Sequence, residues 1–149
     1  MLSFFQERSL RQVLSRFRPL SGGKLGGLAA SVLIVDCETC VMSTMRAILR
    51  LKGHAVECVA SPSEALKAVE GGLRPDLLIA EFVLPGTDGV TLAERIRGAI
   101  PGLPVIIAST GAADFPDRMT ERGFRVLVKP FRWDALNAAV NAALAGSRS

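Results

Sequence analysis

The sequence has few cysteines, no long apolar run and no broad excess of one charge. Three cysteines in 149 residues are too few, and odd in number, for a disulfide scaffold, so we expect reduced thiols in a cytoplasmic protein. No apolar run approaches the roughly 18 residues that a membrane-spanning helix needs. With 49% hydrophobic and 21% charged residues, the composition is typical of a single globular domain and not of a disordered chain.

The basic excess is confined to one end of the chain. The formal net charge is +4, residues 1–30 hold five basic side chains and one acidic, and the remaining residues hold 13 of each sign. The globular part therefore has no positive excess with which to bind a phosphate backbone, and nucleic acid is not an expected partner.

The first 30 residues have the pattern of a basic arm. Residues 1–20 predict a short amphipathic helix. Its apolar side chains recur at helical spacing: Leu10, Val13, Leu14 and Phe17. Residues 21–27 are glycine-rich, which predicts a linker, so residues 1–30 form an extension and residues 31–149 one domain. Three interpretations of the arm stay open: it docks on the domain or a partner, it lies on an anionic membrane surface, or it is disordered or outside the native start.

From residue 31 onward, short β-branched strands alternate with amphipathic helices. Strands are predicted at 32–35, 54–59, 76–80, 104–108 and 124–128, and helices at about 40–52, 62–70, 90–99, 114–122 and 133–144. Five strand–helix repeats with short connections predict an α/β fold, in which helices cover both faces of a parallel five-stranded sheet.

The helical periodicity also assigns side chains to the core. The expected inward stripes are Val41, Thr44, Met45, Ile48 and Leu49 in the first helix of the domain, and Trp133, Leu136, Val140 and Leu144 in the last. Cys58 is expected to be a buried residue of the second strand. His54 is expected at the start of that strand, far from the strand ends, which argues against a zinc site.

Chemically versatile side chains follow four of the predicted strands: Asp36 with Cys37, then Glu81, Ser109 and Lys129. The carboxyl ends of parallel strands lie at one edge of the sheet, where α/β proteins gather their functional groups. We therefore expect these side chains to converge. The chain lacks a glycine-rich GxGxxG sequence after its first strand, so dinucleotide binding is not indicated.

Three local motifs accompany these residues: Val-Asp-x-Glu at 35–38, Leu-Pro-Gly-x-Asp-Gly at 84–89 and Val-Lys-Pro-Phe at 128–131. In this order, after these strands, they make residues 31–145 resemble the receiver domain of response regulators, the CheY-like module of two-component systems. The resemblance implies a flavodoxin-like sheet with strand order 2-1-3-4-5. It also implies a bacterial phosphorelay protein, and we expect a stand-alone one because no output domain follows residue 145.

The resemblance implies an acidic pocket. Typical receivers hold magnesium with two adjacent aspartates after the first strand, and they accept a phosphoryl group on an aspartate after the third. Asp36 matches the first aspartate, Cys37 replaces the second, and Glu38 matches an acid often found next. Glu81 stands at the phosphoacceptor position.

The resemblance also implies the contacts of the phosphoryl group. Ser109, with Thr110 beside it, matches the hydroxyl residue that contacts this group, and Lys129 matches the family's lysine. The Lys129–Pro130 bond is expected to be cis, as is usual in the family. Val126 occupies the place of the aromatic switch residue.

The departures at two positions predict that phosphorylation is lost or very inefficient. A thiol at Cys37 is a poor ligand for magnesium, which prefers six oxygens, so Asp36 would support at most a weak magnesium site and no other cofactor is expected. Glu81 is longer than aspartate by about 1.5 Å, which moves its carboxylate away from the in-line position. We expect a pseudo-receiver that is not an enzyme, with Glu81 near Lys129 and Ser109 in imitation of the phosphorylated state.

The expected partners are a histidine kinase, a phosphotransfer protein or another regulator, docked on the face of the fourth helix, fifth strand and fifth helix. A homodimer through this face is an open alternative. Two other functions stay open. One is a receiver phosphorylated by an unusual route, with Asp36 as its only standard acid. The other is a thiol redox protein that uses the C-x-x-C pair Cys37 and Cys40 at a helix N-terminus.

Overall fold

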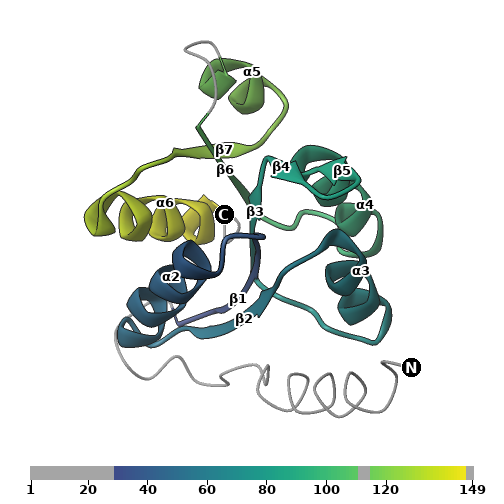
Figure 1. The fold of residues 1–149 in the computed structure, drawn as a ribbon, viewed down its shortest axis with the longest axis horizontal. Helices are drawn as coiled ribbons and strands as arrows, with labels where there is room; N and C mark the ends of the chain where they lie inside the picture. Colours follow the sequence, from purple (N-terminus) through teal and green to yellow (C-terminus); the bar gives the residue numbers. More distant parts are fainter. Residues whose placement is uncertain (1–28, 111–114, 147–149) are drawn as a thin grey trace.

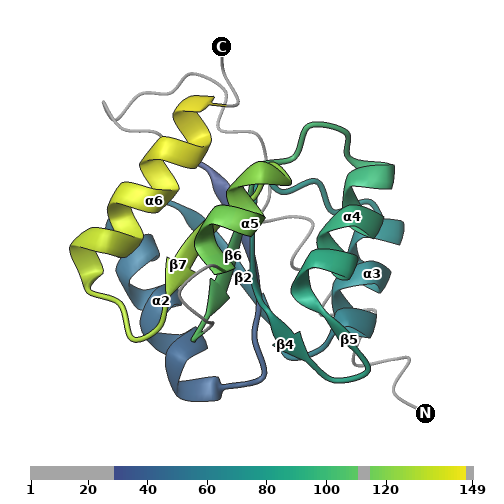
Figure 2. The same ribbon diagram turned by 90° about the horizontal axis from the view of Figure 1, so that it is seen from above.

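The computed structural model describes residues 29–110 and 115–146, and its ribbon is drawn in Figure 1 and Figure 2. The amphipathic helix predicted for the N-terminal arm lies outside the described residues. The strands of the main sheet are β1 (Ser31–Val35), β2 (Ala55–Val59), β3 (Leu77–Glu81), β6 (Val105–Ser109) and β7 (Arg125–Val128). The helices are α2 (Thr39–Leu51), α3 (Pro62–Glu70), α4 (Gly89–Ala99), α5 (Phe115–Glu121) and α6 (Trp133–Gly146).

The five strands form one parallel sheet in the order β2-β1-β3-β6-β7. Counted within the sheet this is 2-1-3-4-5, so the predicted flavodoxin-like topology is confirmed. The register places Val35 of β1 beside Ala80 of β3 and Glu81 beside Ala108 of β6. The carboxyl ends of the central strands therefore meet at one edge.

The helices cover both faces of the sheet, as expected. Helices α2 and α6 lie on one face and α3 and α4 on the other, with α5 beside β7 (Figure 1). Alternate residues of each central strand face opposite layers: Leu33 and Leu78 pack with α3 and α4, whereas Ile34 and Ile79 pack with α2 and α6. Burial of each such Leu or Ile side chain stabilises the fold by roughly 1.5–3 kcal/mol. The packing of both layers therefore holds the central strands, and with them the strand ends, in place.

Local signals explain where the helices begin. Ser61 accepts a hydrogen bond at Oγ from the N–H of Glu64, and Pro62 follows it at the first helical position of α3, a favoured combination. Asp88 caps α4 in the same way by accepting from the N–H of Thr91 at 2.7 Å.

A short hairpin was not predicted. Strands β4 (Val83–Leu84) and β5 (Thr87–Asp88) pair antiparallel around Gly86, where the sequence showed only the Leu-Pro-Gly-x-Asp-Gly motif. Each has two residues, too few for an alternating pattern to be visible in the sequence. The hairpin leads from Glu81, at the end of β3, into α4.

Three core assignments were wrong. Trp133 is 65% exposed, Thr44 is exposed, and Cys58 is only half-buried. Trp133 is the first residue of α6, whose first buried side chain is Leu136. Thr44 lies at the edge of the inward stripe of α2 with its hydroxyl bonded to the Cys40 carbonyl. Cys58 belongs to β2, an outer strand of the sheet.

His54 lies at the amino end of β2, as predicted. Its Nδ1 accepts a hydrogen bond of 3.1 Å from the backbone N–H of Ala30, and the ring is buried. Burial lowers the pKa of His54, because the charged ring is poorly solvated there. The neutral imidazole therefore anchors the entry to β1. Among residues 29–110 and 115–146, no helix combines the length and the hydropathy needed to cross a membrane.

Candidate functional site

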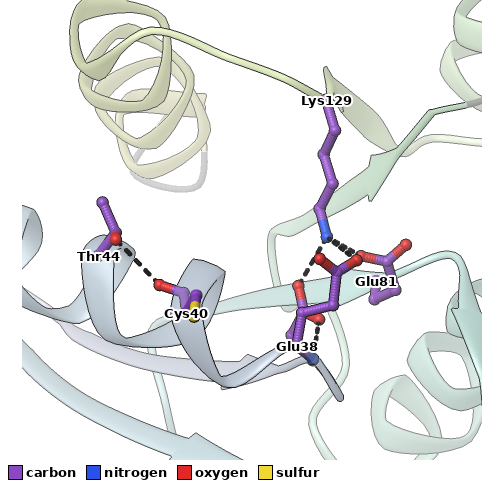
Figure 3. Close-up of polar contacts among 6 residues, drawn as sticks. Glu38, Cys40, Thr44, Glu81 and Lys129 are labelled. Atoms are coloured by element: carbon purple, nitrogen blue, oxygen red, sulfur yellow. Dashed lines mark hydrogen bonds and ion pairs between the residues drawn. The ribbon is translucent and has the colours of Figure 1, made fainter.

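Three elements of the sheet deliver the polar side chains of the site to the carboxyl edge. Asp36 directly follows β1, Glu81 is the last residue of β3, and Lys129 directly follows β7. The N–H of Lys129 donates to the carbonyl oxygen of Ser109 at 2.8 Å, so β7 keeps its register beside β6 up to the lysine. From there the long side chain of Lys129 reaches past the end of β6 toward Glu81 (Figure 3).

The ammonium of Lys129 is the centre of the site. Its Nζ donates to Asp36 Oδ2 at 2.9 Å and to Glu81 Oε2 through a very short contact, and it lies 3.6 Å from Glu38 Oε1. Figure 3 shows Glu38 and Glu81 directed toward the same nitrogen. The structure thus brings together four of the residues singled out from the sequence, three acids and one base.

The site is mostly closed to solvent. Asp36 and Glu81 are buried and the Lys129 side chain is 8% exposed, whereas Glu38 is exposed. Breaking a buried ion pair by removing one partner typically costs about 3–5 kcal/mol, because the other charge is left without a counter-charge. The four side chains are therefore strongly interdependent.

Burial and the ion pairs together determine the pKa values of Glu81 and Lys129. Burial raises the pKa of Glu81, and Lys129 only partly opposes this effect. Burial disfavours the charged ammonium of Lys129 as well, but the bonds to Glu81 and Asp36 outweigh it, so the pKa of Lys129 is raised. The ammonium consequently stays charged at neutral pH, whereas Glu81 takes up a proton at a higher pH than a solvated glutamate.

Both oxygens of Asp36 are engaged. While Oδ2 accepts from Lys129, Oδ1 accepts from the N–H of Glu38 at 2.8 Å. Glu38 is the N-cap residue of α2, and its own side chain caps nothing. Asp36 therefore joins the start of α2 to the ion-paired site. Its hydrogen bond to the N–H two residues further on is that of an Asx turn.

The other predicted site residues lie around this cluster. Ser109 is buried at the end of β6, Thr110 is exposed just beyond it, and Val126 is a half-buried residue of β7 that packs on the α3/α4 layer. Cys37 is not part of the cluster of acids, although it lies between Asp36 and Glu38 in the sequence, and its side chain is exposed. Lys129–Pro130 is cis.

Cys37 and Cys40 are both exposed with free thiols at the start of α2. Cys40 lies near Thr44 in Figure 3 and lines a groove of about 390 Å³ beside the ion-paired cluster. The groove is lined by Glu38, Cys40, Val41, Thr44, Thr110, Lys129, Pro130 and Phe131. It extends the site outward between α2 and the β7–α6 connection.

The role of Gly89, the last glycine of the Leu-Pro-Gly-x-Asp-Gly motif, was not predicted from the sequence. A Cβ atom built on this residue would lie 2.3 Å from the backbone oxygen of Glu81. Only glycine permits this close approach, through which the start of α4 supports the end of β3. The repeated glycine in the motif was the available signal.

The acids of the cluster can be compared with the needs of magnesium, the metal that the resemblance to receiver domains implies. Asp36, Glu38 and Glu81 each offer an oxygen, and these atoms lie within 4.8 Å of one another, the donor type that magnesium prefers. The ammonium of Lys129 already contacts all three residues. With Lys129 in this position the site does not fit a divalent cation.

Known proteins resemble this chain in sequence and in fold. The family profile of the response regulator receiver domain matches residues 32–141. This chain belongs to the receiver domain family. Receivers act in two-component signalling, where they interact with kinases or other regulators.

The chain is similar to the receiver part of longer bacterial regulators. It is 32% identical over 114 residues to the C4-dicarboxylate transport transcriptional regulatory protein DctD of Rhizobium meliloti. This match covers 72% of this chain and 24% of that protein. It is 30% identical over 115 residues to the DNA-binding response regulator MtrA of Mycolicibacterium smegmatis, which covers 76% of this chain and 50% of that protein. The receiver thus spans half or less of the length of these curated relatives.

Among solved structures, the chemotaxis response regulator CheY4 of Vibrio cholerae superimposes with a TM-score of 0.70 at 25% identity. The superposition covers 78% of this chain and 99% of that one. The shared part is therefore a complete receiver fold.

Proposed function

We propose that this receiver signals by binding a partner protein without a phosphate cycle. The observation that carries the proposal is the contact between the Lys129 ammonium and the Glu81 carboxylate at the end of β3. Glu81 presents a carboxylate to the lysine that in typical receivers meets the phosphoryl group. Its single charge is smaller than the −1.5 to −2 of a phosphoryl group, but burial strengthens its interaction with the lysine.

Two features of the site argue against efficient phosphoryl transfer. Glu81 is longer than aspartate, and its Oε2 is engaged by Lys129. In addition, Cys37 is exposed and supplies no oxygen to the cluster. A positioned nucleophile and charge stabilisation are the main contributions of a protein to this reaction, so we propose no enzymatic activity for this chain.

The proposed docking surface is the face formed by α5, β7 and α6. Val128 is 48% exposed and Trp133 65% exposed, and these two large apolar side chains lie on either side of Lys129 and Pro130 in the chain. Exposed aromatic residues of this kind often anchor protein interfaces. We propose a histidine kinase, a phosphotransfer protein or another regulator as the partner, and a stand-alone mode of action like that of a single receiver.

The test of the proposal is incubation of the full chain with acetyl phosphate and magnesium, followed by intact-mass measurement. We expect the mass to stay unchanged. A stable adduct with the mass of one phosphoryl group would overturn the proposal, and it would favour the alternative of a receiver phosphorylated by an unusual route. A receiver with two aspartates after its first strand and an aspartate phosphoacceptor serves as the positive control.

The thiol redox alternative has a separate test. Cys37 and Cys40 are exposed at the start of α2, where a helix N-terminus favours thiolate. Free thiols are counted after equilibration in dithiol buffers of increasing oxidising power. A disulfide between the two cysteines that forms and opens over a defined potential range would support this alternative.

A further inference from the structure

We propose that Lys129 is the resident cation of the acidic pocket and that its ammonium excludes a divalent metal ion from it. The proposal concerns what the pocket binds. It does not depend on whether the chain accepts phosphate.

The contacts place the ammonium where a bridging cation would lie. Asp36, Glu38 and Glu81 come from two segments of the chain, yet each offers an oxygen within 4.8 Å of the others. The Nζ of Lys129 is hydrogen-bonded to Asp36 and Glu81 and ion-paired with Glu38 at 3.6 Å. An ammonium has three N–H donors and no acceptor, so one lysine can serve three carboxylates.

The position of the lysine is fixed by the backbone. Its N–H is bonded to the Ser109 carbonyl at 2.8 Å, and its side chain is 8% exposed. The raised pKa of Lys129 keeps the ammonium charged at neutral pH. A tethered charge of this kind is present at every moment, unlike a dissolved ion, which must be bound from solution.

A divalent ion would compete for the same oxygens. Magnesium and manganese need oxygen ligands at close range, about 2.0–2.1 Å for magnesium, and a second cation among these three carboxylates would be repelled by the ammonium. The ion could enter only if Lys129 left, which would strip a buried lysine of its counter-charges. The exposed side chain of Cys37 offers no compensating hard ligand.

The experiment measures binding of Mn²⁺, a paramagnetic ion that suits carboxylate ligands, by the EPR signal of the free ion. The full chain is compared with Lys129→Met and with Lys129→Gln, which keeps N–H donors without the charge. Lys67→Met is the matched control, since Lys67 is an exposed lysine of α3, away from the site.

We expect no saturable binding to the unaltered chain or to Lys67→Met. The two Lys129 variants should gain one Mn²⁺ site, with an affinity at least about tenfold above any residual binding to Lys67→Met, because a contacting positive charge is removed. Adding Asp36→Asn to either variant should abolish that site, which locates the metal at the cluster. If Lys129→Met does not fold, Lys129→Gln gives the same comparison.

Two results would overturn the proposal. One is a saturable Mn²⁺ site in the unaltered chain that Asp36→Asn removes, because the ammonium would then not exclude the ion. The other is a folded Lys129 variant that still binds no Mn²⁺, because the acids alone would then be insufficient. Phosphoryl labelling of the unaltered chain would contradict the proposed function and leave the Mn²⁺ comparison standing.

Discussion

Gly89 lies against the backbone of Glu81 so closely that a methyl group at position 89 would meet the Glu81 carbonyl oxygen at 2.3 Å. The N–H of Gly89 donates to the Phe82 carbonyl at 2.8 Å, which holds the start of α4 at the end of β3. The position of the Glu81 side chain therefore depends on a glycine eight residues further along the chain.

Gly89→Ala should destabilise the fold by about 1–3 kcal/mol, because the inserted methyl group forces a backbone shift. Gly98→Ala is the matched control: Gly98 also belongs to α4, and a methyl group added there would meet no atom within 4 Å. That variant should be stabilised by up to about 1 kcal/mol through helix propensity. Urea unfolding measures both changes, and equal effects of the two variants would contradict the prediction.

Glu81→Gln should change how stability depends on pH. The folded pKa of Glu81 is raised by burial, so above the unfolded value of about 4.3 the native state keeps a proton that the unfolded chain has lost. Stability then falls as the pH rises toward the folded pKa, and a glutamine has no such titration. Urea unfolding from about pH 4 to pH 8 should show the stability of Glu81→Gln rising relative to the parent chain. A difference that does not vary with pH would refute this.

Two substitutions together should restore phosphoryl labelling. Glu81→Asp shortens the side chain, and Cys37→Asp supplies a carboxylate beside Asp36 that can bind a hard cation. Intact-mass measurement after acetyl phosphate treatment should show an adduct for the double variant and little or none for either single variant. Full labelling of Glu81→Asp alone would show that Cys37 is no obstacle.

His54 should make the fold sensitive to acid. The pKa of His54 in the folded protein lies below the usual 6.5 because of burial. Its contribution to the free energy of unfolding is therefore complete above pH 6.5 and is lost as the pH falls through the folded pKa. His54 is the only histidine of the chain, so NMR titration of its ring measures the pKa directly. His54→Asn keeps a side-chain acceptor for Ala30 without titrating and should flatten this loss. A ring pKa above 6.5 would contradict the prediction.

Trp133→Ala should weaken partner binding without affecting the fold. The side chain is 65% exposed, so stability should change by no more than about 0.5 kcal/mol. Capture of two-component proteins from the source cell should fall with this variant. Leu51→Ala is the control, because Leu51 is 82% exposed but lies at the end of α2, away from the proposed face. Equal capture by both variants would show that Trp133 does not contribute to the interface.

The sequence was sufficient to predict the sheet because each strand is a short β-branched run between clear helix signals. It was also sufficient to predict that Asp36, Glu81 and Lys129 converge, since parallel strands place their carboxyl ends at one edge. The two-residue strands β4 and β5 could not be predicted, because they have no periodicity. The direction of the Cys37 side chain depends on the turn into α2, which residue types alone do not specify.

The errors at Trp133 and Thr44 have a common origin. Helical periodicity states which residues share a face, but it does not state how far along the helix that face remains against the sheet. Trp133 precedes Leu136, the first buried side chain of α6, and the hydroxyl of Thr44 bonds the helix backbone. The contact of Gly89 with Glu81 joins two backbones, and no side-chain pattern encodes it.

Residues 128–133 contain both the lysine that fills the pocket and the two outward apolar side chains, Val128 and Trp133. One short connection therefore carries both the buried charge and the exposed apolar surface, with no other element between them in the chain. We therefore expect that a change at the acids, whether protonation or substitution, alters the surface that Val128 and Trp133 offer to a bound protein.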